Sequence, residues 1–441
     1  MSASIVTHPS QQRLGSNPSH RVPDARSLSL LGLGIVLTWL FLGLYDTGMS
    51  HVIPNKSLVR LAIIGILAGL VCLRPTVNPG LRFNRSFIGF ALLTLLTGVA
   101  SSVLCKAPEL GLLKLLLYVS LWMPLVCCSR GLTELLETSR GRTCFLITAF
   151  LLILLGLYRA FRPAEVEIGN TNFLSAVAFC VMPVFMLEQA NPRPLIPRRL
   201  NGHILGLAIF ICILNHSRGA LVSGTVALVS WYALYRSPSI SRIAGIFYLG
   251  LLTLSLFIVI NESLREYVYK GQETLLDRTR INEFDQTFQF VMQRPLLGYG
   301  FGLSWRVEPW HTEKVLKHGR ISWYIGEFGN STLAILGGGG LLLLLAFVGM
   351  MVTAFSQAIR AMKLEFHRFG ITHDYRMLAA TFSGALGLLV HSQAEGWMLS
   401  PATMATFSFW MFIGMMILLT GKLLVKHRTN PPTEVLKQVG H

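Results

Sequence analysis

Twelve apolar stretches divide the sequence, and each is close to the length that a helix needs to cross a bilayer. A transmembrane helix takes about 20 apolar residues, and the shorter stretches can extend into the polar residues beside them. Only helices and closed barrels satisfy their backbone hydrogen bonds in lipid, and these stretches lack the alternation of barrel strands. The sequence therefore predicts an all-α integral membrane protein with about 12 transmembrane helices. The stretches are 28–45, 58–73, 86–105, 110–129, 144–161, 173–187, 204–216, 219–235, 243–260, 331–355, 377–394 and 403–425.

Composition agrees with this class. Of 441 residues, 52% are hydrophobic and 13% are charged, which is too apolar for a soluble protein. The net charge of +17 would suit nucleic acid, but Lys- and Arg-rich loops explain it in a membrane protein, so no nucleic-acid partner is expected. The seven cysteines lie in or beside apolar stretches, as small buried residues do. No residues have metal-ligand spacing, and we expect neither a metal nor a cofactor.

Lys and Arg are distributed unequally between alternate connections of the stretches. One side, which includes both termini, holds 22 of these cations, whereas the short connections of the other side hold five. Because Lys- and Arg-rich loops stay in the cytoplasm, both termini are predicted to be cytoplasmic. The chain then divides into a disordered cytoplasmic tail (1–27), helices one to nine (28–260), a large extracytoplasmic loop (261–330), helices ten to twelve (331–425) and a second cytoplasmic tail (426–441).

The polar segment 262–330 within that loop is where we expect the chemistry. It carries nine Lys or Arg and nine Asp or Glu. A loop of this length is uncommon unless it is functional or disordered, and its aromatic content argues against disorder. The glycines of GYGFG at 298–302 are expected to permit a tight turn against another element, because no βαβ unit surrounds them to form a dinucleotide site. The run Gly337–Gly340 is expected to pack closely against a neighbouring helix, with a hinge or a substrate portal as the alternative.

The same loop contains an expected amphipathic helix lying on the bundle. Apolar residues recur at helical intervals after Asp277, and two arginines lie in the first turns. The apolar residues are Ile281, Phe284, Phe288 and Val291, and the arginines are Arg278 and Arg280.

Arg218 lies in NHSRGA at 215–220, a very short connection on the predicted outer face. A guanidinium there could hold a phosphate in bidentate fashion, although a cation that simply marks a turn is the alternative. Two arginine groups and a membrane setting together suggest a lipid-linked pyrophosphate, whose departure in a transfer reaction the arginines would stabilise without a metal. A base would deprotonate the attacking hydroxyl, and the loop offers three candidates, each of which could instead be a plain surface residue. They are His311, His318 and Glu327. Lys114, inside an apolar stretch, is expected to extend toward the interface.

Four segments together resemble the O-antigen polymerase and O-antigen ligase superfamily, whose members are integral membrane glycosyltransferases. They are TNFLSAVAFCVMP at 171–183, SRGALVSG at 217–224, RINEFDQTFQFVMQRPLLGYGFG at 280–302 and GNSTLAILGGGGLL at 329–342. The resemblance implies an inverting transfer of glycan from a polyprenyl (undecaprenyl) diphosphate carrier. It implies that Arg218 and Arg280 bind the diphosphate and that Asn330 matches the family's His-Asn pair. Gly329 stands where the family usually has histidine, so His318, Glu327 or His311 would have to replace that base.

The resemblance implies an enzyme of the bacterial cytoplasmic (inner) membrane that makes a surface polysaccharide. A polymerase of O-antigen or exopolysaccharide, which transfers glycan to another glycan, is the first hypothesis. A ligase that transfers O-antigen to the lipid A core of lipopolysaccharide or to protein is the alternative within this class. The expected partners are the lipid-linked donor, a glycan or lipid acceptor, the bilayer and other polysaccharide-assembly proteins. His391, with Ser392 and Glu395 beside it, could shape the acceptor site or could be a polar helix end in water.

A lipid-linked glycan transporter is the alternative from another class, since about twelve spans would also suit two transporter halves. A transporter is expected to place ionisable residues near mid-bilayer around a central cavity. Here acidic residues are nearly absent from the apolar stretches, and polar groups collect at one face. This distribution favours an enzyme that works at the membrane surface.

Overall fold

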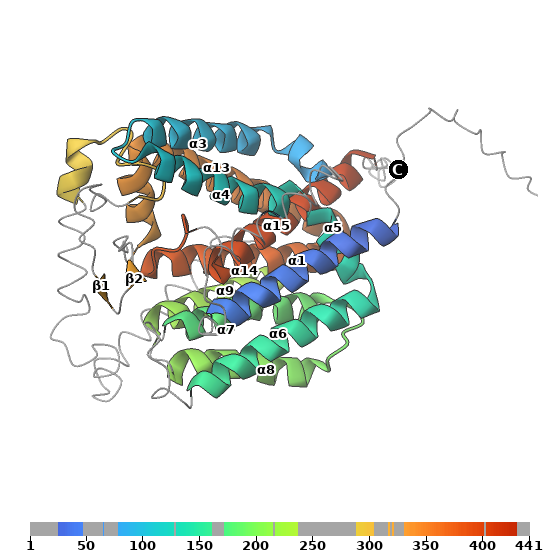
Figure 1. Ribbon diagram of the computed structural model, residues 1–441. Helices are drawn as coiled ribbons and strands as arrows, with labels where there is room; N and C mark the ends of the chain where they lie inside the picture. The colour runs from blue at the N-terminus through green and yellow to red at the C-terminus, as the bar shows by residue number, and fades with distance from the viewer. Residues whose placement is uncertain are drawn as a thin grey trace, which may run out of the picture.

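The computed structural model describes residues 25–46, 65, 78–127, 129–160, 172–214, 217–236, 288–303, 316–317, 320–321, 330–400 and 403–429 (Figure 1). Nearly all of these residues are helical. The helices are α1 (Ala25–Asp46), the 3-10 helix η2 (Pro79–Phe83), α3 (Arg85–Val103), α4 (Pro108–Cys127), α5 (Ser129–Glu137), α6 (Ser139–Ala160), α7 (Asn172–Ala190), α8 (Arg198–Leu214), α9 (Arg218–Arg236), α13 (Ser331–Phe369), α14 (His373–Ala394) and α15 (Met404–Thr429). Two short strands, β1 (Leu316–Lys317) and β2 (Arg320–Ile321), pair in antiparallel fashion.

The helices form where the apolar stretches predict them. Ten of the twelve stretches coincide with a helix, and the other two, 58–73 and 243–260, lie outside the described residues apart from Gly65. Among the described residues, four helices (α3, α4, α13 and α15) are long and apolar enough to cross a membrane, or five if α5 and α6 form one bent span. The chain is therefore an all-α membrane protein, and the count of about 12 spans stays a prediction.

Two helices depart from the predicted pattern. α13 continues from the apolar stretch 331–355 to Phe369, because its sequence becomes amphipathic: Ala358 and Met362 are buried, whereas Arg360 is exposed. α5 forms in a segment that was expected to be a polar connection, and it meets α6 at an angle of 106°. Mean hydropathy alone predicts a loop for α5 and for the last turns of α13, because the apolar residues of these segments cover only one helix face.

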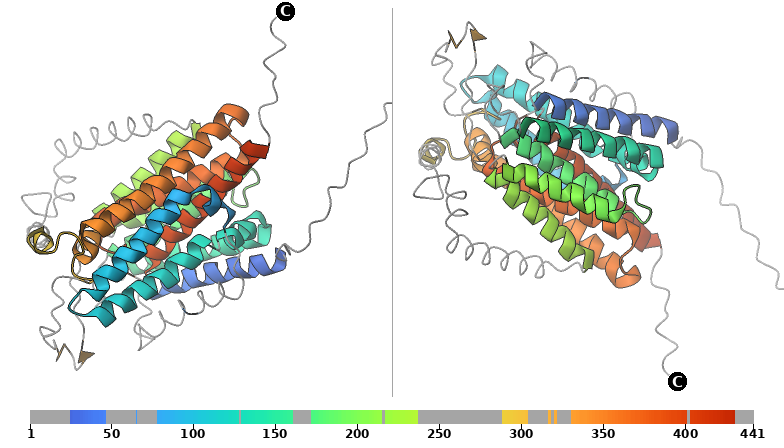
Figure 2. Two further views of the ribbon diagram at one scale, coloured as in Figure 1. Left: turned by 90° about the horizontal axis from the view of Figure 1, so that it is seen from above. Right: turned by 90° about the horizontal axis from the view of Figure 1, so that it is seen from below.

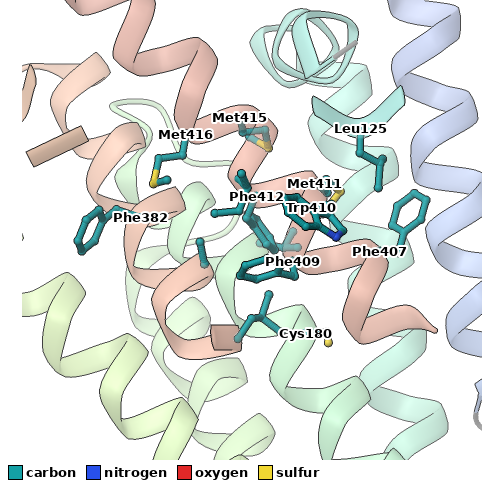
Figure 3. Packing of buried hydrophobic residues seen from close by; sticks show 14 of the residues in the cluster. Leu125, Cys180, Phe382, Phe407, Phe409, Trp410, Met411, Phe412, Met415 and Met416 are labelled. Carbon is teal, nitrogen blue, oxygen red and sulfur yellow. The ribbon is translucent and has the colours of Figure 1, made fainter. Parts of the chain in front are cut away.

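α15 forms the centre of the bundle. It packs against α14, α13, α4 and η2. In an apolar stretch of 18 residues, 83% of its residues are buried, compared with 39% in the corresponding stretches of α3 and α4. Figure 3 shows the aromatic residues that fill this centre, among them Phe407, Phe409 and Trp410. The Trp410 ring lies 6.1 Å from that of Tyr118 on α4 and 6.4 Å from that of Phe347 on α13. α15 is therefore a buried scaffold on which the outer helices are arranged.

The long helices lie roughly along one common direction (Figure 2), so the bundle has two ends. We call the end that carries residues 288–303 the loop end; the C-terminal turns of α15 lie at the other (Figures 1 and 2). That opposite end holds ion pairs of the basic connections, such as Lys422 with Asp374 (3.2 Å) and Lys426 with the buried Glu365 (2.7 Å). The uneven distribution of cations thus follows the axis of the bundle. The cytoplasmic placement of this end stays a prediction.

Candidate functional site

Three helix ends meet at the loop end and carry polar residues that the sequence singled out. α9 begins at Arg218, α13 follows Asn330, and α14 ends at Ala394. α14 packs along both α9 and α13, and the beginnings of these two helices both lie beside its last turn, at Ala394 and Gln393. We call the resulting group the helix-end cluster. It consists of Ser217–Arg218, Asn330–Thr332 and His391–Glu395.

Asn330 joins two helices of this cluster. Its Oδ1 accepts hydrogen bonds from the N–H groups of Thr332 (2.7 Å) and Leu333 (3.1 Å), which caps α13. Its Nδ2 donates to the Gln393 carbonyl (2.8 Å), and the Thr332 hydroxyl donates to the Gln393 side-chain oxygen (2.6 Å). The asparagine is thus held in one orientation, and it fixes the start of α13 against the end of α14.

The connection between α14 and α15 is held by buried polar groups. The Ser331 hydroxyl donates to the Glu395 carbonyl (2.8 Å) and accepts from the Met398 N–H (3.0 Å). The His391 Nδ1 accepts a hydrogen bond from the Trp397 Nε1 (2.9 Å), and the two rings stack at 6.0 Å. Only 1% of His391 is exposed, so it lies inside the bundle rather than at a helix end in water. Its role in acceptor binding stays a prediction.

Arg218 is positioned by close packing of α9 on α14. It is the first residue of α9 and is half-buried. A Cβ atom added at the next residue, Gly219, would lie 2.5 Å from the Ala394 Cβ, so the two main chains approach as closely as glycine allows. The helix N-terminus adds positive potential to that of the guanidinium, which suits an anionic ligand.

The four-glycine run of α13 lies against the glycine-rich segment of the loop, and two of its carbonyl groups accept hydrogen bonds from that segment. α13 is broken at Gly340, where φ is 68°. The carbonyls of Gly337 and Gly338 accept hydrogen bonds from the N–H groups of Tyr299 (2.9 Å) and Gly300 (2.8 Å). We call Gly298–Gly302 and Gly337–Gly340 together the glycine joint.

A side chain does not fit at Gly298 or at Gly340 of the glycine joint. A Cβ atom at Gly298, where φ is 62°, would lie 2.6 Å from the Gly337 carbonyl oxygen, and one at Gly340 would lie 2.3 Å from the main chain of Leu296. The prediction that the GYGFG glycines form a tight turn against another element is confirmed, and the element is α13. The four-glycine run packs closely, as expected, but against a loop segment, so the expectation of a neighbouring helix is wrong for these contacts.

α3 and α4 support the joint from the side. The Lys114 Nζ donates to the Gly302 carbonyl (2.6 Å), so this cation holds the end of the loop segment. The Ser101 hydroxyl donates to the Gly338 carbonyl (2.7 Å). Phe301 is fully buried, with its ring 5.3 Å from that of Tyr118. Residues 298–303 are therefore anchored to three helices.

The Tyr299 hydroxyl donates to the Phe290 carbonyl (3.0 Å) and to the Gln293 side-chain oxygen (3.2 Å). Partial burial raises the pKa of Tyr299, and the nearby charge of Arg294 opposes that rise. The phenol therefore stays protonated near neutral pH and remains a hydrogen-bond donor.

An apolar groove of about 450 Å³ begins at the helix-end cluster and runs between α13 and α14. Ser331, Thr332 and Gln393 line its polar end. Apolar residues of α13 as far as Phe355 line the rest, together with Leu389 and Val390 of α14. Val352 in its wall is 60% exposed, so the groove is open at the outer surface of the bundle.

Part of the predicted site lies outside the described residues. It comprises Arg278 and Arg280 of the predicted diphosphate site and the three candidate bases His311, His318 and Glu327. The structure adds residues that sequence reasoning missed, namely the Thr332–Gln393 pair and Lys114. The position of Thr332, two residues after the capping Asn330, does not indicate that its hydroxyl binds a residue of another helix. Lys114 was expected to extend toward the membrane interface, and its contact with the Gly302 carbonyl was not predicted.

Residues 203–348 match a family model described as O-antigen ligase. The matched segment includes Arg218, Asn330 and the glycine joint, which are the parts brought together at the loop end. No curated protein matches the chain. The match supports the superfamily resemblance and contains three of its four segments, 217–224, 280–302 and 329–342, whereas 171–183 lies outside it.

Proposed function

We propose that this chain, whose segment 203–348 matches a family model described as O-antigen ligase, is an enzyme of the O-antigen polymerase and O-antigen ligase superfamily and polymerises a bacterial surface polysaccharide. It transfers glycan from a polyprenyl diphosphate carrier to a hydroxyl of another lipid-linked glycan. One observation carries the proposal: within the matched segment, Asn330 hydrogen-bonds to Gln393 at the polar end of an apolar groove, and Gly219, next to Arg218, packs on the neighbouring Ala394. A phosphate-binding group beside a hydrocarbon-binding groove is the arrangement that a lipid diphosphate requires.

Arg218 binds the diphosphate, together with Arg278 and Arg280 of the loop. The acceptor oxygen attacks the anomeric carbon, and the bond from that carbon to the diphosphate oxygen breaks with inversion. The guanidinium groups stabilise the charge that develops on the leaving diphosphate. The proton of the acceptor hydroxyl passes to His318, Glu327 or His311, since Gly329 cannot act as a base. Asn330 keeps the start of α13 in place beside this reaction.

The groove between α13 and α14 receives the polyprenyl chain. Its wall is apolar from Ile335 onward, and its polar end lies where the diphosphate would be. The opening beside Val352 lets a carrier enter from the bilayer without leaving the lipid phase.

A ligase is the second candidate, because the matching family model is described as O-antigen ligase. The donor half of the reaction would be the same, and the acceptor would be the lipid A core or a protein. The superfamily match and the position of the polar residues at one end of the described bundle favour either enzyme over a lipid-linked glycan transporter.

The remaining features belong to the same proposal. The chain spans the inner membrane about 12 times with both termini in the cytoplasm, and the loop 261–330 is extracytoplasmic. The transfer needs no metal, because arginines supply the charge that stabilises the leaving group.

The test is the size distribution of surface and carrier-linked glycans in cells that lack the protein. A polymerase predicts single repeat units on the acceptor and no long chains, whereas a ligase predicts long chains that accumulate on the carrier at the outer face. Carrier-linked repeats trapped on the cytoplasmic face would overturn the enzyme proposal in favour of transport. Complementation with R218A should fail, and complementation with R236A, which removes the same charge from the other end of α9, should succeed.

A further inference from the structure

A stripe of exposed apolar side chains precedes the glycine joint. Phe288, Met292 and Leu296 are 57%, 63% and 58% exposed. Their spacing of four residues puts them on one face of the helical turns at 288–293 and of the turn that follows. Val291, on another side of these turns, is 5% exposed and packs inward. The sequence predicted that Phe288 and Val291 would both pack on the bundle, and this is wrong for Phe288.

The stripe is continuous with the lipid-facing surface of α13. The Leu341 N–H donates to the Pro295 carbonyl (2.7 Å), and the Leu342 N–H donates to the Leu296 carbonyl (3.3 Å). Leu341 and Leu342 are themselves 43% and 40% exposed on a helix that is apolar and long enough to cross a membrane. Main-chain hydrogen bonds therefore join the stripe to a membrane-spanning surface.

α3 extends the same surface on another flank. Arg294 donates to the Leu104 carbonyl (3.5 Å), and Leu104 is 63% exposed at the end of α3. The Arg294 guanidinium lies 5.4 Å from the centre of the Tyr299 ring. An arginine and a tyrosine beside exposed apolar residues are typical of the boundary between headgroups and acyl chains. In both views of Figure 2, residues 288–303 lie at the margin of the bundle beside the first turns of α13.

We infer that residues 288–296 lie in the membrane interface, with Phe288, Met292 and Leu296 inserted among the phospholipids of the leaflet at the loop end. An interfacial segment of this kind buries its apolar face by about 5–10 Å at the boundary of headgroups and acyl chains. Phospholipid is the occupant because the stripe continues two membrane-facing helices. The insertion holds the glycine joint at the level of the headgroups, and this inference does not depend on the proposed glycan transfer.

A photo-crosslinking amino acid at single positions tests this inference in the full-length protein, reconstituted in bilayers of phosphatidylethanolamine and phosphatidylglycerol. The tested positions are Phe288 and Met292. Gln293, which is exposed on the polar flank of the same turns, is the matched control. Leu345, 56% exposed on α13, is the positive control for lipid contact. Mass spectrometry after illumination measures the yield of phospholipid adducts.

We expect adducts at Phe288 and Met292 at several times the yield at Gln293 and comparable to that at Leu345. The attachment points should lie near the glycerol for the two stripe positions and deeper in the acyl chains for Leu345. Equal yields at Met292 and Gln293, or adducts to a second copy of the chain, would overturn the inference. Each variant is also tested for its elution as a monodisperse protein, and a misfolded variant is replaced by the same substitution at Leu296.

Discussion

Replacing Gly219 with alanine tests whether the close packing of α9 on α14 positions Arg218. The new Cβ would lie 2.5 Å from the Ala394 Cβ, whereas carbon atoms in contact are separated by about 3.5–4 Å. The Ala394 methyl group cannot rotate away, so the start of α9 must move from the end of α14 by roughly 1 Å. Arg218 is the adjacent residue and moves with it.

Two opposing effects determine the stability of G219A. Overpacking costs about 1–3 kcal/mol, and the higher helix propensity of alanine returns about 1 kcal/mol. The net loss is therefore about 0–2 kcal/mol, and the protein should fold. Activity is more sensitive, since a displacement of about 1 Å at a reacting group can lower a rate roughly 100-fold. We expect a strong loss of glycan transfer with little change in thermal stability.

The assay is the initial rate of glycan transfer by purified protein in nanodiscs with a lipid-linked oligosaccharide, measured alongside the thermal unfolding midpoint. The matched control is the double variant G219A/A394G, which removes the opposing methyl group at the last residue of α14, where glycine costs little. This variant should recover most of the activity. Wild-type activity in G219A, or no recovery in the double variant, would refute the packing argument.

Further predictions concern the glycine joint, Arg218 and Arg280, and the independence of the transfer from metal ions. G298A should lower the free energy of unfolding by about 2–5 kcal/mol, since it combines a positive φ with a steric clash. G370A, with a φ of 71° and no atom within 4 Å, should cost only about 1–2 kcal/mol. R218K should lower transfer about 10-fold or more, because an ammonium cannot replace the guanidinium fork. R280A should abolish transfer without changing the amount of protein in the membrane. A chelator should leave the transfer rate unchanged.

Each of these predictions has a result that contradicts it. Equal losses of stability in G298A and G370A would mean that the joint tolerates a side chain. Near-normal transfer by R218K would indicate a role for charge alone, and transfer by R280A would remove that arginine from the site. Inhibition by the chelator that a divalent ion reverses would establish a metal-dependent mechanism.

The sequence predicts most of the described helices because their apolar runs are long and uniform. It fails where a helix is amphipathic, as in α5 and in the last turns of α13, since hydropathy averages the two faces of such a helix. The sequence does not predict how the helices are arranged relative to one another. Nothing in the sequence indicates that the core would form around α15 and Trp410.

The site shows the same division. The short connection at Arg218 and the glycines of the loop stood out because each is unusual in its local context. Asn330 is recognisable from its family motif, and it caps α13. The partners of these residues could not be predicted, because Gly300 and Gly338, or Thr332 and Gln393, are far apart in sequence and are brought together only by packing. His391 is buried beside Trp397 for the same reason.

The glycine joint attaches the loop to α13 through main-chain groups and leaves the side chains elsewhere in the loop out of this attachment. Its central contacts run between main-chain groups, with no side chain in the space between the loop segment and α13. The rest of the loop can therefore change its side chains without loosening this attachment, provided that the glycines remain. Substitutions elsewhere in the loop can therefore alter its chemistry during evolution while its attachment to α13 stays the same.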